Sequence, residues 1–267
     1  MDGLVEMALF GLLVGFLVGL TGVGGGSLMS PFLLSVGVPA PTAIGTDLAY
    51  ATITKLFGSA QHRRQRSVNL QVVAYLALGS VPAGLLGVYT VDRLERIYSA
   101  RSVDGILGTA IAAVVILAGL SLIARHFIPE KPGRRGKIGG WDGQSPMSLR
   151  RKALTTALGA IGGYLVGLTS IGSGTMIAVI LLLVYPLSSV EVVGTDVAHA
   201  TILSFTVGLA HALSGNVSFE ITGILLLGGI PGVLIGSRLA RAVPGRPLRL
   251  LLAAMLIFVG VRMILSG

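Results

Sequence analysis

Two short segments place a carboxylate directly after a glycine and a threonine inside apolar stretches of the chain. The sequence GTDLAYAT occupies residues 45–52, and GTDVAHAT occupies residues 194–201. An ionised carboxylate is costly to bury among apolar residues, so Asp47 and Asp196 are expected to have a specific role. Two roles are open. Each residue caps the start of a helix, or each binds a proton or a cation and couples its movement to transport.

A second pair of segments is rich in glycine and hydroxyl side chains. GLTGVGGGS occupies residues 19–27 and GLTSIGSGT residues 167–175, each between two apolar stretches. The glycines are expected to interrupt a helix, and the N–H groups freed at the start of the next helix can bind an anion. Ser27, Ser173 and Thr175 add hydroxyl donors. The alternative is that the glycines only permit tight crossing of helices.

One lysine and three histidines are the other polar residues considered for chemistry within the apolar stretches. Lys55 follows Asp47 by about two helical turns. Either it extends to the membrane surface, or it is the counter-charge of a bound anion. His62, His199 and His211 each complete a hydrogen bond or take part in coupling. Their spacing matches no metal-binding motif, so no metal site is predicted.

The composition places these residues in a membrane. Of 267 residues, 53% are hydrophobic and 12% are charged, and the mean hydropathy is +0.86, which is atypical of a soluble domain. The net charge of +9 is divided among short clusters between apolar stretches, a pattern typical of membrane topology rather than nucleic-acid binding. The motifs of ATPases, hydrolases and proteases are absent from the sequence, so neither an enzyme nor a cofactor is predicted.

The chain is internally duplicated. The glycine-rich segments are 148 positions apart, and the GTD segments are 149 apart. A shared offset indicates two related halves. We predict a membrane repeat over residues 1–124, a polar linker over 125–149 and a second repeat over 150–267. Their apolar elements are expected at residues 4–20, 24–37, 42–60, 70–90 and 103–124, and at 150–168, 172–186, 192–213, 220–238 and 248–265.

The charges of equivalent loops predict that the halves are inserted in opposite orientations. HRRQR at residues 62–66 is strongly basic, whereas its counterpart HALSGN at 211–216 is uncharged. Basic loops stay in the cytoplasm, so the linker is expected there and both termini outside. The predicted fold is an all-α integral membrane protein of two inverted-topology repeats, with about three to five membrane helices each and about eight to ten membrane elements in total. Helices are broken or re-entrant at the glycine-rich motifs, and the second element of each half is either a short span or the return limb of a re-entrant hairpin.

The duplicated motifs resemble the sulfite exporter TauE/SafE family. The resemblance rests on GLTGVGGGSLMSPFLL and GTDLAYAT, followed by GLTSIGSGT and GTDVAHAT, and it covers nearly the whole chain. It implies a multi-pass protein of a bacterial or archaeal inner membrane whose partners are the lipid bilayer and a small sulfur-containing anion, such as sulfite, a sulfonate or thiosulfate. The favoured function is a secondary transporter, as an exporter, that works by alternating access. The alternatives are a passive anion channel and an intramembrane enzyme or scaffold.

Carried over residue by residue, the resemblance predicts one substrate site shared by the two halves. The candidate substrate-binding residues, with Lys55 added as the counter-charge, are Gly24, Gly25, Gly26, Ser27, Thr46, Lys55, Gly172, Ser173, Gly174, Thr175 and Thr195. The candidates for coupling are Asp47, Asp196, His199, His62 and His211.

Overall fold

The described part of the chain is helical. The structure, a computed structural model, describes residues 2–21, 26–64, 66–127, 146–172, 174–185, 187–239 and 245–266. Within these ranges there are ten α-helices and no strands. They are α1 (Asp2–Thr21), α2 (Gly26–Ser35), α3 (Ala40–Arg64), α4 (Leu70–Ile97), α5 (Ala100–Phe127), α6 (Leu149–Thr169), α7 (Met176–Val184), α8 (Ser189–Leu213), α9 (Phe219–Leu239) and α10 (Gly245–Ser266).

Each predicted apolar element corresponds to one of these helices, with ends that differ by a few residues. The predicted linker, 125–149, lies mostly outside the described residues. The second element of each half is shorter than predicted, because α2 has 10 residues and α7 has 9. At 1.5 Å per residue each is roughly 15 Å long, about half of the hydrocarbon thickness. Neither described helix is long enough to cross the membrane alone. The choice between a short span and the return limb of a re-entrant hairpin stays a prediction.

Among the described residues, four helices are long and apolar enough to cross a membrane: α4, α5, α8 and α9. Shorter apolar stretches lie in α1, from Leu4 to Leu20, and in α10, from Leu250 to Leu265. The helix α3 falls outside both groups because it carries Asp47, Lys55 and a basic last turn. It packs against α2, α5, α8 and α9, which together shield its polar side chains.

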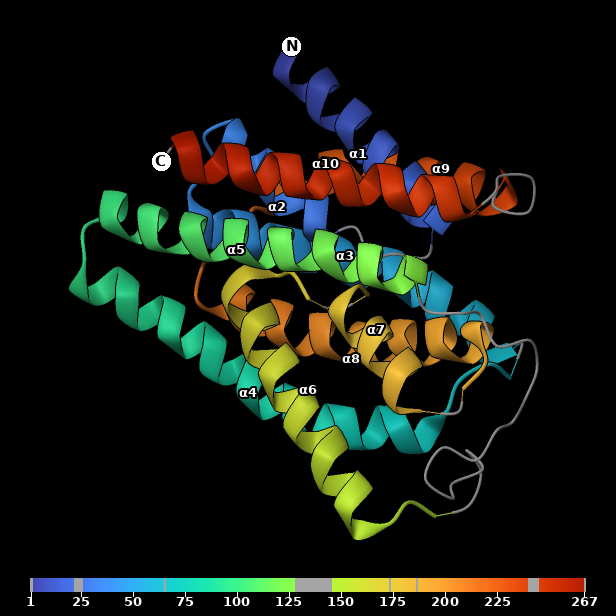
Figure 1. Cartoon of the computed structure of the whole chain (residues 1–267). Helices are drawn as coiled ribbons and strands as arrows, with labels where there is room; N and C mark the ends of the chain where they lie inside the picture. Colours follow the sequence, from blue (N-terminus) through green and yellow to red (C-terminus); the bar gives the residue numbers. More distant parts are fainter. Residues whose placement is uncertain are drawn as a thin grey trace.

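The helices of the two halves pair reciprocally. The first helix of each half packs most extensively on the fourth helix of the other, as α1 on α9 and α6 on α4. The third helices, α3 and α8, pair with each other, and so do the fifth helices, α5 and α10. In Figure 1 the paired helices α5 and α10 run in opposite directions: α5 runs from left to right, and the C-terminus marks the left end of α10.

The pair α3 and α8 is also antiparallel. Leu48, early in α3, lies against Gly208, late in α8, whereas Gly58, late in α3, lies against Val197, early in α8. The polar helix of the first half therefore crosses its counterpart near the middle of both. Residues at equivalent positions of the two motifs come to lie on opposite sides of this crossing.

Small residues bring the reciprocal pairs into backbone contact. A Cβ atom added at Gly15 on α1 would lie 2.2 Å from the carbonyl oxygen of Gly229 on α9. At the equivalent contact, a Cβ added at Gly163 on α6 would lie 2.1 Å from the carbonyl oxygen of Ser80 on α4. Glycine is required at both positions, and tight helix crossing is therefore one role of the glycines in this chain.

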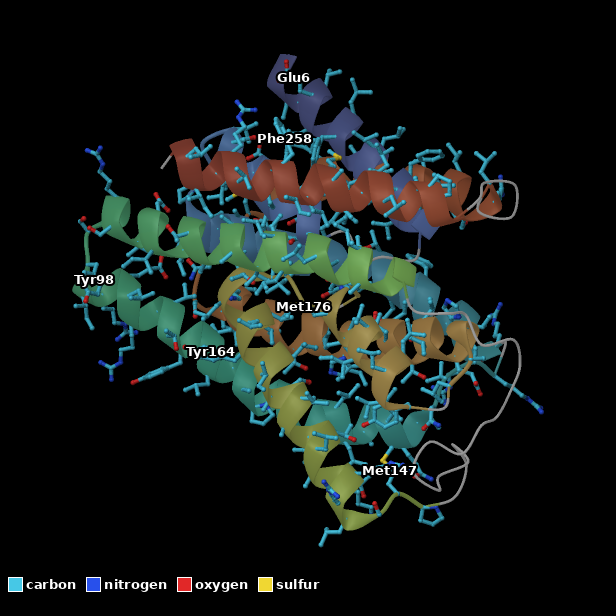
Figure 2. All side chains as sticks on the ribbon, in the orientation of Figure 1. Glu6, Tyr98, Met147, Tyr164, Met176 and Phe258 are labelled. Carbon is cyan, nitrogen blue, oxygen red and sulfur yellow. The ribbon has the colours of Figure 1, made fainter. Side chains whose placement is uncertain are left out.

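The surface of the bundle is apolar, as expected for a protein that lies in lipid. Phe258 on α10 is 67% exposed and points outward in Figure 2, and Tyr98 lies at the edge beside the end of α4. Met176, the first residue of α7, lies near the centre of the same view and is partly buried against the hydrophobic core. Buried polar side chains gather on α2, α3 and α8 and at Thr175, the N-cap residue of α7.

Candidate functional site

The glycine of each GTD motif lets a loop of the other half approach the helix. A Cβ atom at Gly45 would lie 1.9 Å from the carbonyl oxygen of Asn216, in the loop before α9. A Cβ atom at Gly194 would lie 2.5 Å from the carbonyl oxygen of Ser67, in the loop before α4. A carbon atom and a carbonyl oxygen cannot approach this closely, so a side chain at either glycine would displace the loop.

The threonine of each motif holds the same loop. The backbone N–H of Ser218 donates a hydrogen bond of 3.0 Å to Thr46 Oγ1, and the N–H of Asn69 donates one of 2.9 Å to Thr195 Oγ1. Both N–H groups precede a fourth helix, where backbone donors have no partner within the helix. Thr46 and Thr195 thus fix the start of α9 and of α4. Their predicted substrate contact stays a prediction.

The aspartate of each motif lies well inside its helix, so the interpretation of Asp47 and Asp196 as N-caps is wrong. Helix α3 begins at Ala40, whose N–H donates to Asp104 Oδ1 on α5 at 2.7 Å. Helix α8 is capped by Ser188. Segments that are polar and rich in small residues precede the aspartates, and they belong to the helices because the surrounding bundle buries them.

Asp47 is fully buried and receives two serine hydroxyls from other elements. Ser30 Oγ on α2 donates to Asp47 Oδ2 at 2.9 Å, and Ser170 Oγ donates to the same oxygen at 2.5 Å. The two hydroxyls lie 2.7 Å apart. Asp47 Oδ1 is buried without a hydrogen-bond partner. The carboxylate of the first half therefore joins the helix after the first glycine-rich segment to the second glycine-rich segment.

Asp196 is 2% exposed and contacts the second glycine-rich segment within its own half. The N–H of Gly174 donates to Asp196 Oδ1 at 3.3 Å. Ser170 and Gly174 belong to one short segment, so a single interruption of the second half reaches both aspartates. A positive φ of 94° at Gly174 and of 128° at Gly172 turns the backbone there. These values are readily available to glycine only.

Lys55 is buried in the interior, and 8% of its surface is exposed. Its charge interacts with Asp196 and, less strongly, with Asp47. The hydroxyl of Thr201 on α8 donates to the carbonyl oxygen of Lys55 at 3.3 Å, which places this turn of α3 at the crossing with α8. The interpretation that Lys55 extends to the membrane surface is wrong, because the neighbouring helices cover it and the carboxylates attract it. Its equivalent in the second half is Ser204, whose hydroxyl is buried without a hydrogen-bond partner.

The two helices that follow the glycine-rich segments each begin beside an unused hydroxyl. Ser27, in the first turn of α2, is 3% exposed, and Thr175, the N-cap residue of α7, is 1% exposed. Both hydroxyls are buried without a hydrogen-bond partner. Gly26 is the first residue of α2. The other predicted members of these segments, Gly24, Gly25 and Ser173, lie outside the described residues.

His199 and Tyr50 occupy equivalent positions with complementary neighbours. His199 Nε2 lies 2.8 Å from Ser80 Oγ on α4, and its Nδ1 is buried without a partner. The ring of Tyr50 lies against Gly229 on α9, which is the equivalent of Ser80, and its hydroxyl lies 3.4 Å from the carbonyl oxygen of Gly11. The larger ring, that of Tyr50, thus lies beside glycine, whereas the smaller ring of His199 lies beside serine.

The other two predicted histidines hold the ends of their helices. His211 Nε2 lies 3.0 Å from the carbonyl oxygen of Gly167, so this nitrogen carries the proton. His62 Nδ1 lies 3.0 Å from Ser67 Oγ in the adjacent loop. Within the described ranges, His, Cys, Asp and Glu side chains form no group of three or more that could hold a metal ion.

Ser30 and Ser170 are the residues of the site that the sequence reasoning missed. Serine is common in membrane helices as a small packing residue, so its type alone carried no signal. A weak signal was available. Ser170 lies within the glycine-rich segment of the second half, and Ser30 follows Ser27 by about one helical turn.

Apolar helices that enclose carboxylates, a lysine and unpaired hydroxyls define a polytopic membrane protein with a polar interior, the class that includes secondary transporters. The chain belongs to the sulfite exporter TauE/SafE family, whose model matches residues 7–263. It is a membrane transporter of that family.

Three relatives illustrate the range of similarity. The probable membrane transporter protein YjnA of Bacillus subtilis is 40% identical over 97% of this chain and 99% of the relative. The probable membrane transporter protein YunE of the same organism is 24% identical over 98% of each chain. Sulfite exporter TauE/SafE family protein 3 of Arabidopsis thaliana is 30% identical over 45% of this chain and 24% of the relative. No solved structure matches the chain.

Proposed function

We propose that this transporter is a secondary transporter that exports a small sulfur-containing anion, such as sulfite, a sulfonate or thiosulfate. The observation that carries the proposal is the pair of buried, unpaired hydroxyls of Ser27 and Thr175 at equivalent helix starts. A buried hydroxyl without a partner is costly, so it points to a ligand that completes its hydrogen bond. The family description and the Arabidopsis relative, both of which name sulfite export, support the sulfur anion.

The chemistry at both helix starts favours an anion. The N–H groups at the start of α2 and α7 carry partial positive charge, and oxyanions are bound well by such N–H groups together with hydroxyls. The proposed site is formed by Gly24, Gly25, Gly26 and Ser27 with Gly172, Ser173, Gly174 and Thr175. The contact between Ser30 and Ser170 supports a single site, because it joins the helix after the first segment to the second segment.

Alternating access is the proposed mechanism. Equivalent helices of the two halves pair in antiparallel fashion at α3 and α8, which is compatible with inverted repeats that rock about a shared site. A passive anion channel is the second candidate. The buried carboxylates near the pathway favour the transporter, because a channel does not need ionisable groups that bind a coupling ion.

A binding screen followed by counterflow tests this proposal. The purified protein is heated with sulfite, sulfate, thiosulfate, sulfoacetate or taurine, and a ligand that binds the native state raises its melting temperature. Each ligand is then loaded into proteoliposomes, and uptake of its radiolabelled form is measured. A transporter accumulates label transiently against its gradient, whereas a channel only equilibrates it. Absence of stabilisation and of flux for all five compounds would contradict the proposed function.

The proposed topology places the linker in the cytoplasm and both termini outside a bacterial or archaeal inner membrane. The chain has no cysteine, so single cysteines can be introduced without background. Ser99→Cys, before α5, is expected to react with an impermeant maleimide in intact cells, and Arg64→Cys, at the end of α3, only after the cells are opened. The reverse labelling pattern would invert the proposed topology.

A further inference from the structure

The crossing of α3 and α8 encloses a cluster with unbalanced charge. Asp47, Lys55 and Asp196 are all buried, and Lys55 interacts electrostatically with both carboxylates. Tyr50 on the same helix and His199 on α8 also interact electrostatically with this cluster. Both are neutral in their ordinary states near pH 7. Two negative charges and one positive charge leave an excess of one negative charge in a site proposed to receive an anion.

The hydrogen-bond partners of the two carboxylates differ in the protonation state that they favour. The donor to Asp196 is the backbone N–H of Gly174, which can only donate, so this partner requires an acceptor and favours the ionised carboxylate. Lys55 interacts more strongly with Asp196 than with Asp47. These contacts favour Asp196, rather than Asp47, as the charge partner of Lys55.

Asp47 can adopt either protonation state without losing its partners. Its neighbours Ser30 and Ser170 present hydroxyls, which donate to an ionised carboxylate and accept from a protonated one. The two hydroxyls lie 2.7 Å apart, so either one can donate to the other when it no longer donates to Asp47. Asp47 Oδ1 is buried without a hydrogen-bond partner, so no donor stabilises a negative charge on it.

We propose that Asp47 carries a proton that crosses the membrane together with the anion, while Lys55 and Asp196 remain a resident ion pair. The inference rests on the proposed transport function. The proton leaves water on the loading side, binds Asp47 and is released to water on the other side, with no other bond formed or broken. Protonation removes the excess negative charge, so it favours anion binding. By reciprocity the anion favours protonation, and the two therefore travel in the same direction.

Infrared difference spectroscopy tests the assignment without a substrate. Acidification of the purified protein is expected to produce the C=O band of a buried protonated carboxyl group. The band should be lost in Asp47→Asn. In Asp196→Asn it should still form, but only at more acidic pH, because Lys55 then balances the charge of Asp47 alone. Asp47→Glu, which keeps the carboxyl group if the amide variant fails to fold, should retain a band at a shifted frequency. A band that persists in Asp47→Asn, or that disappears only in Asp196→Asn, would overturn the assignment.

A flux measurement tests the coupling. Proteoliposomes that enclose a pH-sensitive dye receive an inward gradient of thiosulfate, whose charge does not change near neutral pH. Uptake should acidify the lumen in the wild type and not in Asp47→Asn. Thiosulfate uptake without proton movement would overturn co-transport while leaving the proposed transport function intact. An Asp47 band in a protein that moves none of the five anions would contradict the proposed function alone.

Discussion

The glycine of the first GTD motif is expected to tolerate no side chain. In Gly45→Ala, the new Cβ atom would lie 1.9 Å from the carbonyl oxygen of Asn216. A carbon–oxygen contact needs about 3.3 Å, so the loop must move by about 1.4 Å. The movement also stretches the 3.0 Å hydrogen bond from Ser218 N–H to Thr46 Oγ1. Overpacking costs about 1–3 kcal/mol and the lost hydrogen bond about 1 kcal/mol, giving a destabilisation of about 2–4 kcal/mol.

The matched control lies on the same helix. In Gly58→Ala the nearest atom to the new Cβ is 3.4 Å away, on the side chain of Val197, which is an ordinary contact. Alanine is also favoured over glycine within a helix by about 1 kcal/mol. The assay heats each detergent-solubilised variant and measures the fraction that stays monodisperse by size-exclusion chromatography. If Gly45→Ala and Gly58→Ala lose monodispersity at the same temperature, the reasoning about the loop is refuted.

Four further substitutions, one of them combined with a second-site change, probe other contacts of the protein. Thr46→Val and Thr195→Val should each destabilise the protein by about 1–3 kcal/mol, because each removes the hydrogen bond that the threonine accepts from a loop N–H, and thermal melts should show this loss. His199→Tyr should lower the melting temperature, because the larger ring collides with Ser80. Adding Ser80→Gly should restore the melting temperature, because the tyrosine and glycine then match the equivalent pair, Tyr50 and Gly229. A double variant that melts as low as His199→Tyr would contradict this complementarity. Ser188→Ala should cost about 1 kcal/mol through loss of the capping box of α8, which a melt compared with the wild type would detect.

The sequence predicted an all-helical chain and the order of its apolar elements, because apolar stretches separated by polar loops mark the helices of a membrane protein. It did not predict that α1 packs on α9 and α6 on α4. Hydropathy says which residues face lipid or protein on average, and it carries no information on which helix is the partner. The GTD glycines likewise gave no sign of the loops that they accommodate, because those loops come from the other half of the chain.

The site was predicted in part. The two GTD aspartates were singled out because their charge is unusual in an apolar stretch, and the structure confirms that both are buried. Their partners depend on how the helices rotate, which the sequence does not specify. The contacts of Ser30 and Ser170 with Asp47, and the inward direction of Lys55, follow from how α2, α6 and α8 pack around α3.

Calorimetric titration of the purified transporter tests the central claim of one shared anion site most directly. Sulfite, sulfate, thiosulfate, sulfoacetate and taurine are each titrated into the wild type, Ser27→Ala, Thr175→Val and the control Gly58→Ala. We expect one anion per chain and an affinity about tenfold lower or more in both hydroxyl variants, because a hydrogen bond to a charged group contributes about 1.5–3 kcal/mol. The control should bind like the wild type. Two anions per chain, with each hydroxyl variant removing one of them, or unchanged affinity in both variants, would contradict the account.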